Sequence, residues 1–374
     1  MSIDLSLYRQ EFPVTCSAIY LNHAAVSPVS CRVRDAMTNL IEDVCRFGGN
    51  HWERWLDAYE AIRAKVASFL NAAPEEIAFI KNTSEGISLF ANGLDWKDGD
   101  EVVSIAPEFP ANYYPWKYLE RKGVRLRLVP ERDGVITVED IAAALRPNTR
   151  VVAVSFVQFL SGCRLDLERL GKVCQERGAL LFVDAIQGLG AFPIDVKRAN
   201  IAALAADGHK WLMGPEGSGL FYIRRDLIER IQPSSVGWMS VKAAEDFSSR
   251  KLEWAEGARR FECGTLNTAG VYGLGAALDL LQEVGAEPIA RRILSLTGRL
   301  REGLRQKGHR VFGPSVPEQC SGIVSFTPAD VDPAEMVRRL SSRGVSVAAR
   351  CGKVRISPHF YNTEEEIDRA LALL

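Results

Sequence analysis

The sequence predicts an α/β protein built on a mostly parallel sheet flanked by helices, with a smaller α+β domain toward the C-terminus. From about residue 60 to 225, short apolar runs alternate with segments whose apolar residues recur at helical spacing. Several of these runs are apolar throughout, which is typical of strands buried on both faces of a covered parallel sheet. After about residue 275 the order changes, because helical segments come first and two short apolar runs follow.

The expected strands of the sheet are residues 77–80, 101–105, 124–128, 151–157, 179–184, 202–206 and 219–223. Helical spacing lies between them, for example over 83–93 and 166–177. Beyond the sheet we expect helices over 276–284 and 289–307 and strands over 321–326 and 345–348. A last helix begins near Thr363, where a hydroxyl and three glutamates suit a helix start. These elements divide the chain into a large domain, 20–275, and a small domain made of 1–19 and 276–374.

Composition and charge exclude several classes of protein. The formal net charge of the 374 residues is −1, so no strong field would attract nucleic acid or an anionic membrane. No run reaches the roughly 18 apolar residues of a membrane helix, and residues 1–5 lack the pattern of a signal peptide. The eight cysteines are scattered without zinc spacing. We therefore expect reduced thiols, no metal site and a cytoplasmic protein.

A lysine and an aspartate each follow an expected strand. Lys210 lies in Asp207-Gly208-His209-Lys210-Trp211, directly after 202–206, and Asp184 ends the run 180–183. Carboxyl ends of parallel strands are where such folds place ligands. Alone, Lys210 could be a surface lysine and Asp184 the cap of a helix over 185–190. Together they are the pair that pyridoxal-5′-phosphate (PLP) requires: a lysine for the Schiff base, and a carboxylate that keeps the pyridine nitrogen protonated.

A third motif, Asn82-Thr83-Ser84-Glu85-Gly86, follows the strand 77–80 and opens a helix. Hydroxyls and backbone N–H groups at a helix N-terminus form an anion site that suits a phosphate ester. The alternative is an ordinary Thr/Ser cap with a capping-box glutamate.

These motifs, followed by Glu262-Cys263-Gly264-Thr265-Leu266-Asn267, stand in the order found in class V aminotransferase-fold enzymes, which the sequence resembles over nearly its whole length. That family includes cysteine desulfurases, selenocysteine lyases, cystine C–S lyases, kynureninases and isopenicillin-N-epimerase-like proteins. The resemblance implies the PLP-dependent transferase fold type I, with 20–275 as the PLP-binding domain. It also implies a homodimer that acts on a small amino-acid substrate.

The resemblance also implies roles for single residues. Lys210 would carry the cofactor as an internal aldimine, with His209 beside the phosphate. Asp184 would pair with the pyridinium nitrogen and Gln187 would hydrogen-bond the phenolic oxygen of the ring. The remaining roles are the phosphate contacts Thr83 and Ser84, the substrate neighbour His23, and Thr265, which would reach the phosphate of the neighbouring subunit.

Two positions depart from the desulfurase pattern. Desulfurases usually place a histidine after the strand 101–105 to stack on the ring. Here the sequence is Glu108-Phe109-Pro110, as in kynureninases, so we assign stacking to Phe109, although a core phenylalanine is the alternative. Where desulfurases often have an asparagine after the strand 151–157, this chain has Gln158-Phe159, and we assign Gln158 to the cofactor site.

Arg355 and Cys351 bear on the substrate and on the reaction. In the family the arginine that matches Arg355 binds the substrate α-carboxylate, and a structural salt bridge is the alternative. Desulfurases carry a persulfide-forming cysteine on a long loop before this arginine. Here only Cys351-Gly352-Lys353-Val354 precedes Arg355, so Cys351 is either a nucleophile or an incidental thiol.

Several functions therefore remain open. The first is cleavage of a C–S or C–Se bond in a cysteine-like amino acid. Aminotransferase, epimerase or kynureninase-like hydrolase activity on the same fold is the second. A non-catalytic binding protein of this fold is the third, and the presence of Lys210, Asp184 and Thr265 argues against it.

Overall fold

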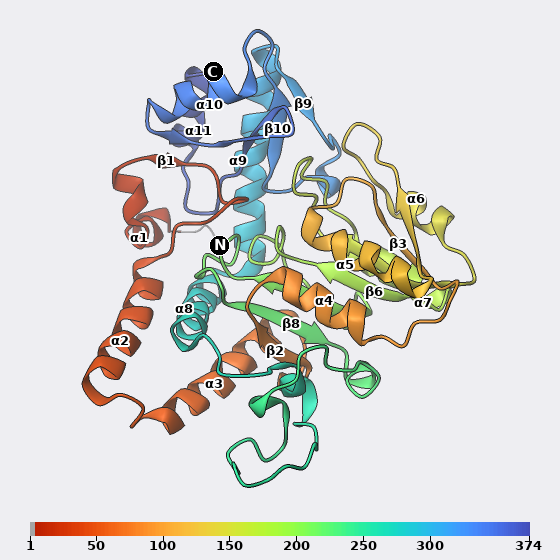
Figure 1. The fold of residues 1–374 in the computed structure, drawn as a ribbon. Coiled ribbons are helices and arrows are strands. Elements are labelled where there is room, and N and C mark those ends of the chain that lie inside the picture. Colours follow the sequence, from red (N-terminus) through yellow and green to blue (C-terminus); the bar gives the residue numbers. More distant parts are fainter. Residues whose placement is uncertain (1–3) are drawn as a thin grey trace.

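A seven-stranded mixed sheet forms the centre of the computed structural model, which describes residues 4–374 (Figure 1). Residues 1–3, which the sequence assigned to the small domain, lie outside the described residues. In spatial order the strands are β2 (Ile77–Ile80), β8 (Gly219–Ile223), β7 (Ile201–Asp207), β6 (Leu180–Asp184), β5 (Thr149–Ser155), β3 (Glu101–Ile105) and β4 (Arg125–Val129). The five strands from β7 to β4 are parallel, and β8 runs antiparallel to both of its neighbours.

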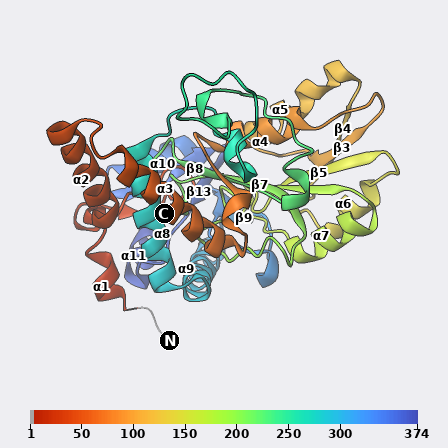
Figure 2. The same cartoon turned by 90° about the horizontal axis from the view of Figure 1, so that it is seen from below.

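Helices cover both faces of this sheet, as Figure 2 shows. On one face lie α4 (Thr83–Gly93) and α5 (Tyr114–Lys117); the other face is covered by α3 (Trp52–Leu70), α6 (Val138–Ala144), α7 (Leu167–Glu176) and α8 (Thr268–Val284). Every residue of β7 is buried, because its side chains enter an apolar cluster on each face. The mostly parallel, doubly covered sheet expected from the apolar runs is confirmed.

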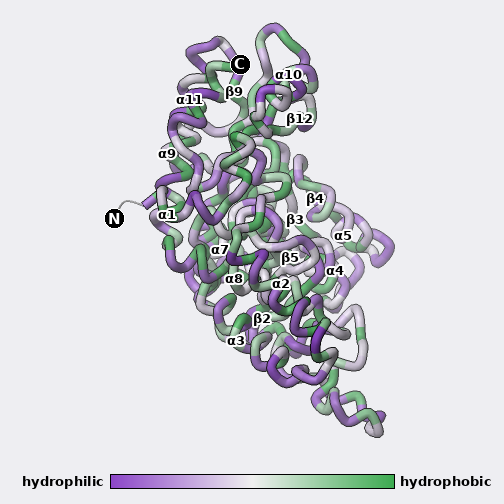
Figure 3. The backbone as a smooth tube through the Cα atoms, turned by 90° about the vertical axis from the view of Figure 1, so that its left-hand side faces the viewer, coloured by the Kyte–Doolittle hydropathy of each residue, from purple (hydrophilic) through white to green (hydrophobic). Residues whose placement is uncertain are grey.

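A second, four-stranded antiparallel sheet lies in the C-terminal region, in the order β12 (Ala348–Arg350), β13 (Lys353–Ile356), β10 (Val324–Thr327) and β9 (Arg310–Phe312). It packs with α9 (Ala286–Gln306), α10 (Pro333–Ser341) and α11 (Glu364–Ala372) around a separate apolar cluster. Thr363 caps α11, since its Oγ1 accepts a hydrogen bond from the Glu366 N–H at 3.2 Å. Figure 3 shows these elements at one end of the molecule, with the large sheet below them.

One expected strand is divided in the structure, and one expected helix begins much earlier than the sequence predicted. The expected strand 345–348 is two strands, because β11 (Val345–Ser346) pairs with β1 (Ile19–Tyr20) while β12 pairs with β13. Helix α8 begins at Thr268, eight residues before the expected start. Its glycines hid the pattern, and they allow close packing: a Cβ at Gly275 would lie 2.7 Å from Ile62 of α3.

The N-terminal residues contact both parts of the chain. Helix α1 (Leu5–Arg9) directs Arg9 toward Glu366 of α11 at 3.0 Å, and β1 extends alongside β11. Helix α2 (Cys31–Phe47) packs instead against α8. The predicted boundary at residue 275 falls inside α8, so the division into 20–275 and 1–19 with 276–374 remains a proposal. No helix among residues 4–374 is both long and apolar enough to cross a membrane.

A buried ion pair fixes the segment that carries Thr265. Arg63 of α3 donates to both carboxylate oxygens of Glu262, at 2.6 and 3.1 Å, and the Phe79 N–H of β2 donates to the same carboxylate at 2.7 Å. The chain reaches this point through an exposed excursion over 233–256, the teal-green loop at the bottom of Figure 1. Removing one partner of such a pair would leave an uncompensated buried charge.

Candidate active site

Side chains that follow the carboxyl ends of several strands meet at one edge of the main sheet. Strand β2 runs in the same direction as β7, so the residues after β2, β3, β5, β6 and β7 share this edge. They line a cavity of about 350 Å³. The predicted site residues that line it are Thr83, Ser84, Phe109, Asp184, Gln187, His209, Lys210 and Arg355.

Lys210 is one of the buried residues that line this cavity. Its side chain is 9% exposed, and burial lowers its pKa to about 8, against the opposing pull of the Asp184 carboxylate. Its Nζ lies 5.4 Å from the ring centroid of Phe109. An amine with this pKa is partly unprotonated near neutral pH, which is what a lysine needs to attack an aldehyde.

Asp184 is a buried carboxylate with few partners. It is 2% exposed, and among residues 4–374 its side chain accepts one hydrogen bond, from the Ile186 N–H at 3.1 Å. Burial raises its pKa to about 6, although Lys210 favours the ionised form. A buried carboxylate with one donor is incompletely satisfied. A cationic ring N–H would complete it, so this donor set fits the cofactor that the sequence implies.

The N-terminus of α4 forms another wall of the cavity. Asn82, not Thr83 or Ser84, caps the helix, because its Oδ1 accepts the Glu85 N–H at 3.0 Å. Thr83 and Ser84 therefore lie in the first turn, where backbone N–H groups have no carbonyl within the helix to bond. His209 lies nearby, with Nδ1 2.9 Å from Asp207 Oδ2. This wall has the donors that a phosphate requires.

Two phenylalanines form an aromatic wall. Phe109 is 43% exposed and meets Phe159 edge to face, with ring centroids 5.4 Å apart. Phe159 also lines the cavity, and sequence reasoning missed it by choosing its neighbour Gln158. Because β5 already ends at Ser155, the residue that would face the cavity could not be counted from strand alternation.

Gln158 is buried and does not line the cavity. Its Nε2 donates to Glu108 Oε1 at 3.2 Å, and Glu108 also accepts the Ser155 N–H at 2.7 Å. Burial raises the pKa of Glu108 to about 7, with Asp184 adding to the rise. Glu108, which the sequence did not single out, thus connects Gln158 to Ser155 at the end of β5.

Arg355 enters the cavity from β13 of the small sheet. It is 3% exposed, and one of its terminal nitrogens donates to the Phe159 carbonyl at 2.8 Å. No Asp or Glu among residues 4–374 lies within ion-pair distance of it, so the structural salt bridge is not found. Burial, and then the nearby Arg350, lower its pKa to about 10. A buried guanidinium without an anion fits a carboxylate ligand.

Arg350 also lines the cavity and was not predicted. It ends β12, opposite Lys353 across a two-residue turn made by Cys351 and Gly352, with φ of 46° and 71°. A residue followed by glycine between two apolar runs is a signal for such a turn. This signal could have placed Arg350 at the end of a strand, directly before the turn. Cys351 itself is exposed at the tip of the hairpin and does not line the cavity.

His23 and Thr265 also lie outside the cavity wall. His23 is fully buried behind Ala24, with Nδ1 2.8 Å from the Ser357 carbonyl and Nε2 2.8 Å from the Tyr361 hydroxyl. Burial and the neighbouring His359 lower its pKa well below the usual range. Thr265 lines a different hollow, shared with Lys81 and Gly217. The structure thus brings together eight of the predicted side chains and leaves His23, Gln158, Thr265 and Cys351 apart from them.

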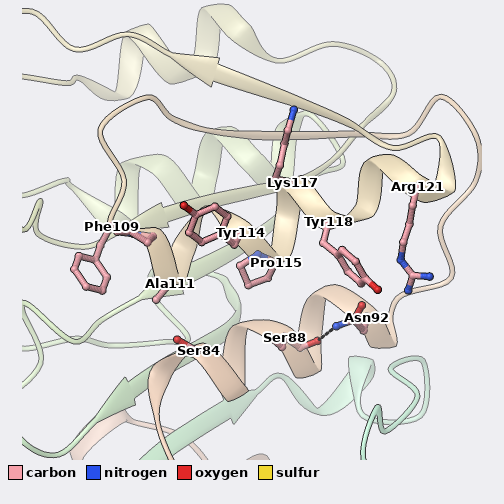
Figure 4. A pocket seen from close by; sticks show the side chains of 11 residues that line it. Ser84, Ser88, Asn92, Phe109, Ala111, Tyr114, Pro115, Lys117, Tyr118 and Arg121 are labelled. Atoms are coloured by element: carbon pink, nitrogen blue, oxygen red, sulfur yellow. Dashed lines mark hydrogen bonds between the residues drawn. The ribbon is translucent and has the colours of Figure 1, made fainter.

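A wider groove of about 940 Å³ adjoins the cavity and shares Ser84, Phe109 and Ala111 with it. Figure 4 shows its aromatic wall: Tyr114 and Tyr118 extend from the segment after Phe109, and α4, which contributes Ser84 and Ser88, lies on the opposite side. Tyr114 and Tyr118 are 65% and 60% exposed. This chain alone therefore leaves a broad apolar surface open beside the cavity.

The chain matches proteins whose names describe chemistry at sulfur. A probable cysteine desulfurase of Methanothermobacter thermautotrophicus is 32% identical, covering 96% of this chain and 94% of its own length. The apo structure of a cysteine desulfurase from Thermococcus onnurineus is 30% identical, with a TM-score of 0.91 and coverage of 100% and 97%. The cystine C–S lyase C-DES, solved with its product cysteine persulfide, is 28% identical, with a TM-score of 0.91 and coverage of 96% and 98%.

The family model for class V aminotransferases matches residues 19–370, which is almost the whole described chain. The match includes both sheets and every residue that lines the cavity. On this ground, and on the similarity of the fold to enzymes of the same group, the chain belongs to the class V aminotransferase family.

Proposed function

We propose that this chain is a PLP-dependent enzyme that cleaves the C–S, or C–Se, bond of a cysteine-like amino acid. The observation that carries the proposal is the convergence of Lys210, Asp184 and Arg355 on one cavity. These residues would bind an aldehyde, a ring nitrogen and a substrate carboxylate. When bound, PLP supplies an electron sink for a carbanion at the substrate Cα.

The remaining cavity residues hold the cofactor in this proposal. Thr83, Ser84 and the first turn of α4 bind the phosphate, with His209 beside them. Phe109 covers one face of the ring and Gln187 faces the phenolic oxygen. Gln158 acts indirectly, through Glu108, because its amide donates there.

Arg355 and Lys210 act on the substrate. Arg355 binds the α-carboxylate and so holds the substrate, with its Cα proton, in the cavity that Lys210 also lines. Lys210 Nζ, with a pKa of about 8, is the base there that can take this proton. His23, buried behind Ala24, would support this end of the site without direct contact.

Elimination is favoured over persulfide transfer as the way the C–S bond is broken. In elimination the proton leaves Cα and the sulfur leaves Cβ with the bonding pair, so no enzyme thiol is needed. Cys351 occupies a two-residue turn between paired strands, and the ladder from Ala348–Arg355 to Arg350–Lys353 holds this turn in place. A thiol held in this way has little reach into the cavity. Aminotransferase, epimerase and kynureninase-like reactions remain alternatives on the same residues.

A homodimer is part of the proposal. Thr265 lies outside the cavity of its own chain, as expected of a residue that reaches the phosphate of a partner. A second copy would also cover the aromatic groove of Tyr114 and Tyr118. The excursion over 233–256 offers exposed apolar side chains for such a contact, among them Phe247 and Leu252. We further propose a reducing, cytoplasmic location, supported by eight cysteines that are all free thiols.

Product analysis tests the reaction. The purified protein should be yellow with PLP, and borohydride should attach the cofactor irreversibly to Lys210. We expect pyruvate and ammonia, with sulfide as the leaving group from cysteine and cysteine persulfide from cystine, and Cys351→Ser should keep most of this activity. Alanine as the product, with a persulfide on Cys351 by mass spectrometry and activity lost in Cys351→Ser, would instead identify a desulfurase. Amino transfer to a keto acid would identify an aminotransferase.

Asp184→Asn should affect activity and stability in opposite directions. Turnover should fall at least about a hundredfold, because an amide cannot keep the ring nitrogen protonated. In the cofactor-free protein, however, the ionised Asp184 carboxylate lowers the free energy of unfolding. Its folded pKa of about 6 lies above the usual 3.8, so the folded state loses stability as the pH rises from about 4 to 6. Above pH 6 the cofactor-free Asp184→Asn variant should therefore be more stable than the cofactor-free native protein, by up to about 3 kcal/mol. This difference in the free energy of unfolding should become smaller as the pH is lowered.

Urea denaturation of cofactor-free protein at pH 5 and pH 8 measures this effect. Asp166→Asn is the matched control, since Asp166 is an exposed helix cap and asparagine caps equally well. A pH-independent difference between Asp184→Asn and the native protein would show that Asp184 is not buried as a destabilising charge.

Arg355→Ala should raise KM for the amino-acid substrate by tens- to several-hundred-fold. A sheltered, charge-assisted contact of this kind contributes on the order of 2–4 kcal/mol. Arg355→Lys should recover only part of the loss, because lysine lacks the planar fork. Steady-state kinetics measure this effect, with the exposed Arg343→Ala as control. An unchanged KM in Arg355→Ala would remove Arg355 from carboxylate binding.

The dimer is tested by mass and by cofactor affinity. Light scattering should give twice the 41.3 kDa mass of one chain. Thr265→Val should weaken PLP binding about tenfold, the effect of one hydrogen bond to a charged group, whereas the exposed Thr327→Val should not. A stable, active, PLP-loaded monomer would contradict the proposal.

A further inference from the structure

Trp211 directly follows Lys210, yet it does not line the cavity. It is 1% exposed, and its indole Nε1–H donates to Gln187 Oε1 at 2.9 Å. The other end of the same amide is also bonded, since Gln187 Nε2 donates to the Ala24 carbonyl at 3.0 Å. The side chain of Gln187, which does line the cavity, is therefore held at both ends by buried groups.

These two contacts allow one orientation of the amide. A flipped Gln187 would place its NH₂ group against the indole N–H and its oxygen against the Ala24 carbonyl. Both contacts would then be unsatisfied and buried, which is costly. In the observed orientation Nε2 has a second hydrogen that is not used by Ala24. The indole thus makes Gln187 a hydrogen-bond donor, and not an acceptor, toward a ligand in the cavity.

The position of Trp211 is itself fixed by residues distant in the sequence. A Cβ at Gly322, in the loop before β10, would lie 2.1 Å from the indole ring, and one at Gly190 would lie 2.2 Å from the Trp211 carbonyl. His359 Nε2 lies 3.1 Å from that carbonyl. Because the Phe360 N–H donates to His359 Nδ1, the Nε2 of this neutral imidazole carries the hydrogen and donates to Trp211.

We propose that Trp211 is a positioning residue, which acts through Gln187 to keep a hydrogen-bond donor directed at the phenolic oxygen of the cofactor. This inference rests on the proposed PLP site. A donor at that oxygen stabilises its negative charge and weakens its hold on the neighbouring proton, so the proton of the bound cofactor leaves at a lower pH. Without the hydrogen bond from the Trp211 indole to Gln187, that proton should stay bound up to a higher pH.

The test is a pH titration of the visible absorption of the PLP-loaded protein. Trp211→Phe keeps most of the ring and removes the N–H, and should raise the midpoint by about 0.5–1 pH unit. Trp116→Phe is the matched control. Trp116 is also fully buried, and its Nε1 donates to another side-chain amide, Asn112 Oδ1, at the same 2.9 Å. Trp116→Phe should leave the midpoint unchanged even if it lowers stability.

A double-variant cycle shows whether the effect passes through Gln187. Gln187→Leu should raise the midpoint, and adding Trp211→Phe to it should produce no further rise. A midpoint that does not move in Trp211→Phe, or shifts that add in the double variant, would overturn the inference. If Trp211→Phe does not fold, Gly322→Ala replaces it, because its methyl group would displace the indole. An unchanged midpoint in Gly322→Ala would overturn the inference in the same way.

The two proposals fail in different ways. A native protein that stays colourless with PLP would refute the proposed function. A yellow native protein with an ordinary titration, and no difference between Trp211→Phe and Trp116→Phe, would refute only the role of Trp211.

Discussion

The rest of the cavity depends on two opposite charges, Asp184 and Lys210, which are buried at the same edge of an apolar sheet. Asp184 ends β6 and Lys210 follows the adjacent strand β7, and the residues of both strands are almost all hydrophobic, so both groups are removed from water. Each is shifted toward its neutral form by burial and toward its charged form by the other. Such a pair is only partly stabilised by its own Coulomb attraction. The site is therefore prepared for a ligand that brings a cationic N–H to one group and an electrophile to the other.

The other half of the cavity comes from a separate layer of the chain. Arg355 belongs to the small antiparallel sheet and donates to the carbonyl of Phe159, in the turn that follows β5 of the large sheet. His359, four residues later, bonds the carbonyl of Trp211, next to Lys210. The two parts of the chain are thus joined by hydrogen bonds at Arg355, which lines the cavity, and at Trp211, which follows the cavity residue Lys210. A change in how the sheets pack would displace both sides together.

The sequence predicted the elements that depend on local pattern. The apolar runs identified the doubly covered sheet, and the polar residues after those runs identified Lys210, Asp184, Thr83 and Ser84, because parallel strands end at a common edge. The contacts that depend on tertiary packing could not be read in this way. Phe159 and Gln158 are neighbours beyond the end of β5. Only the structure shows that Phe159 lines the cavity, whereas Gln158 donates to the buried Glu108.

Long-range relations were missed for the same reason. Nothing in the sequence indicates that Glu108 lies beneath the site, or that Trp211 holds an amide from a different strand end. The early start of α8 was missed because its first turns contain glycines, which have no side chain and so add nothing to a hydrophobic pattern. These glycines allow α8 to pack closely against its neighbours.

The two-residue turn of Cys351 and Gly352 has a consequence for how the family could diversify. It is an exposed hairpin tip whose strands are already registered by their own ladder, so added residues would leave the small sheet intact. Loop closure costs little extra for each doubling of length. Because Arg350, at the base of this turn, lines the cavity, lengthening this one connection could add a mobile segment beside the cavity without changing the other residues of its wall.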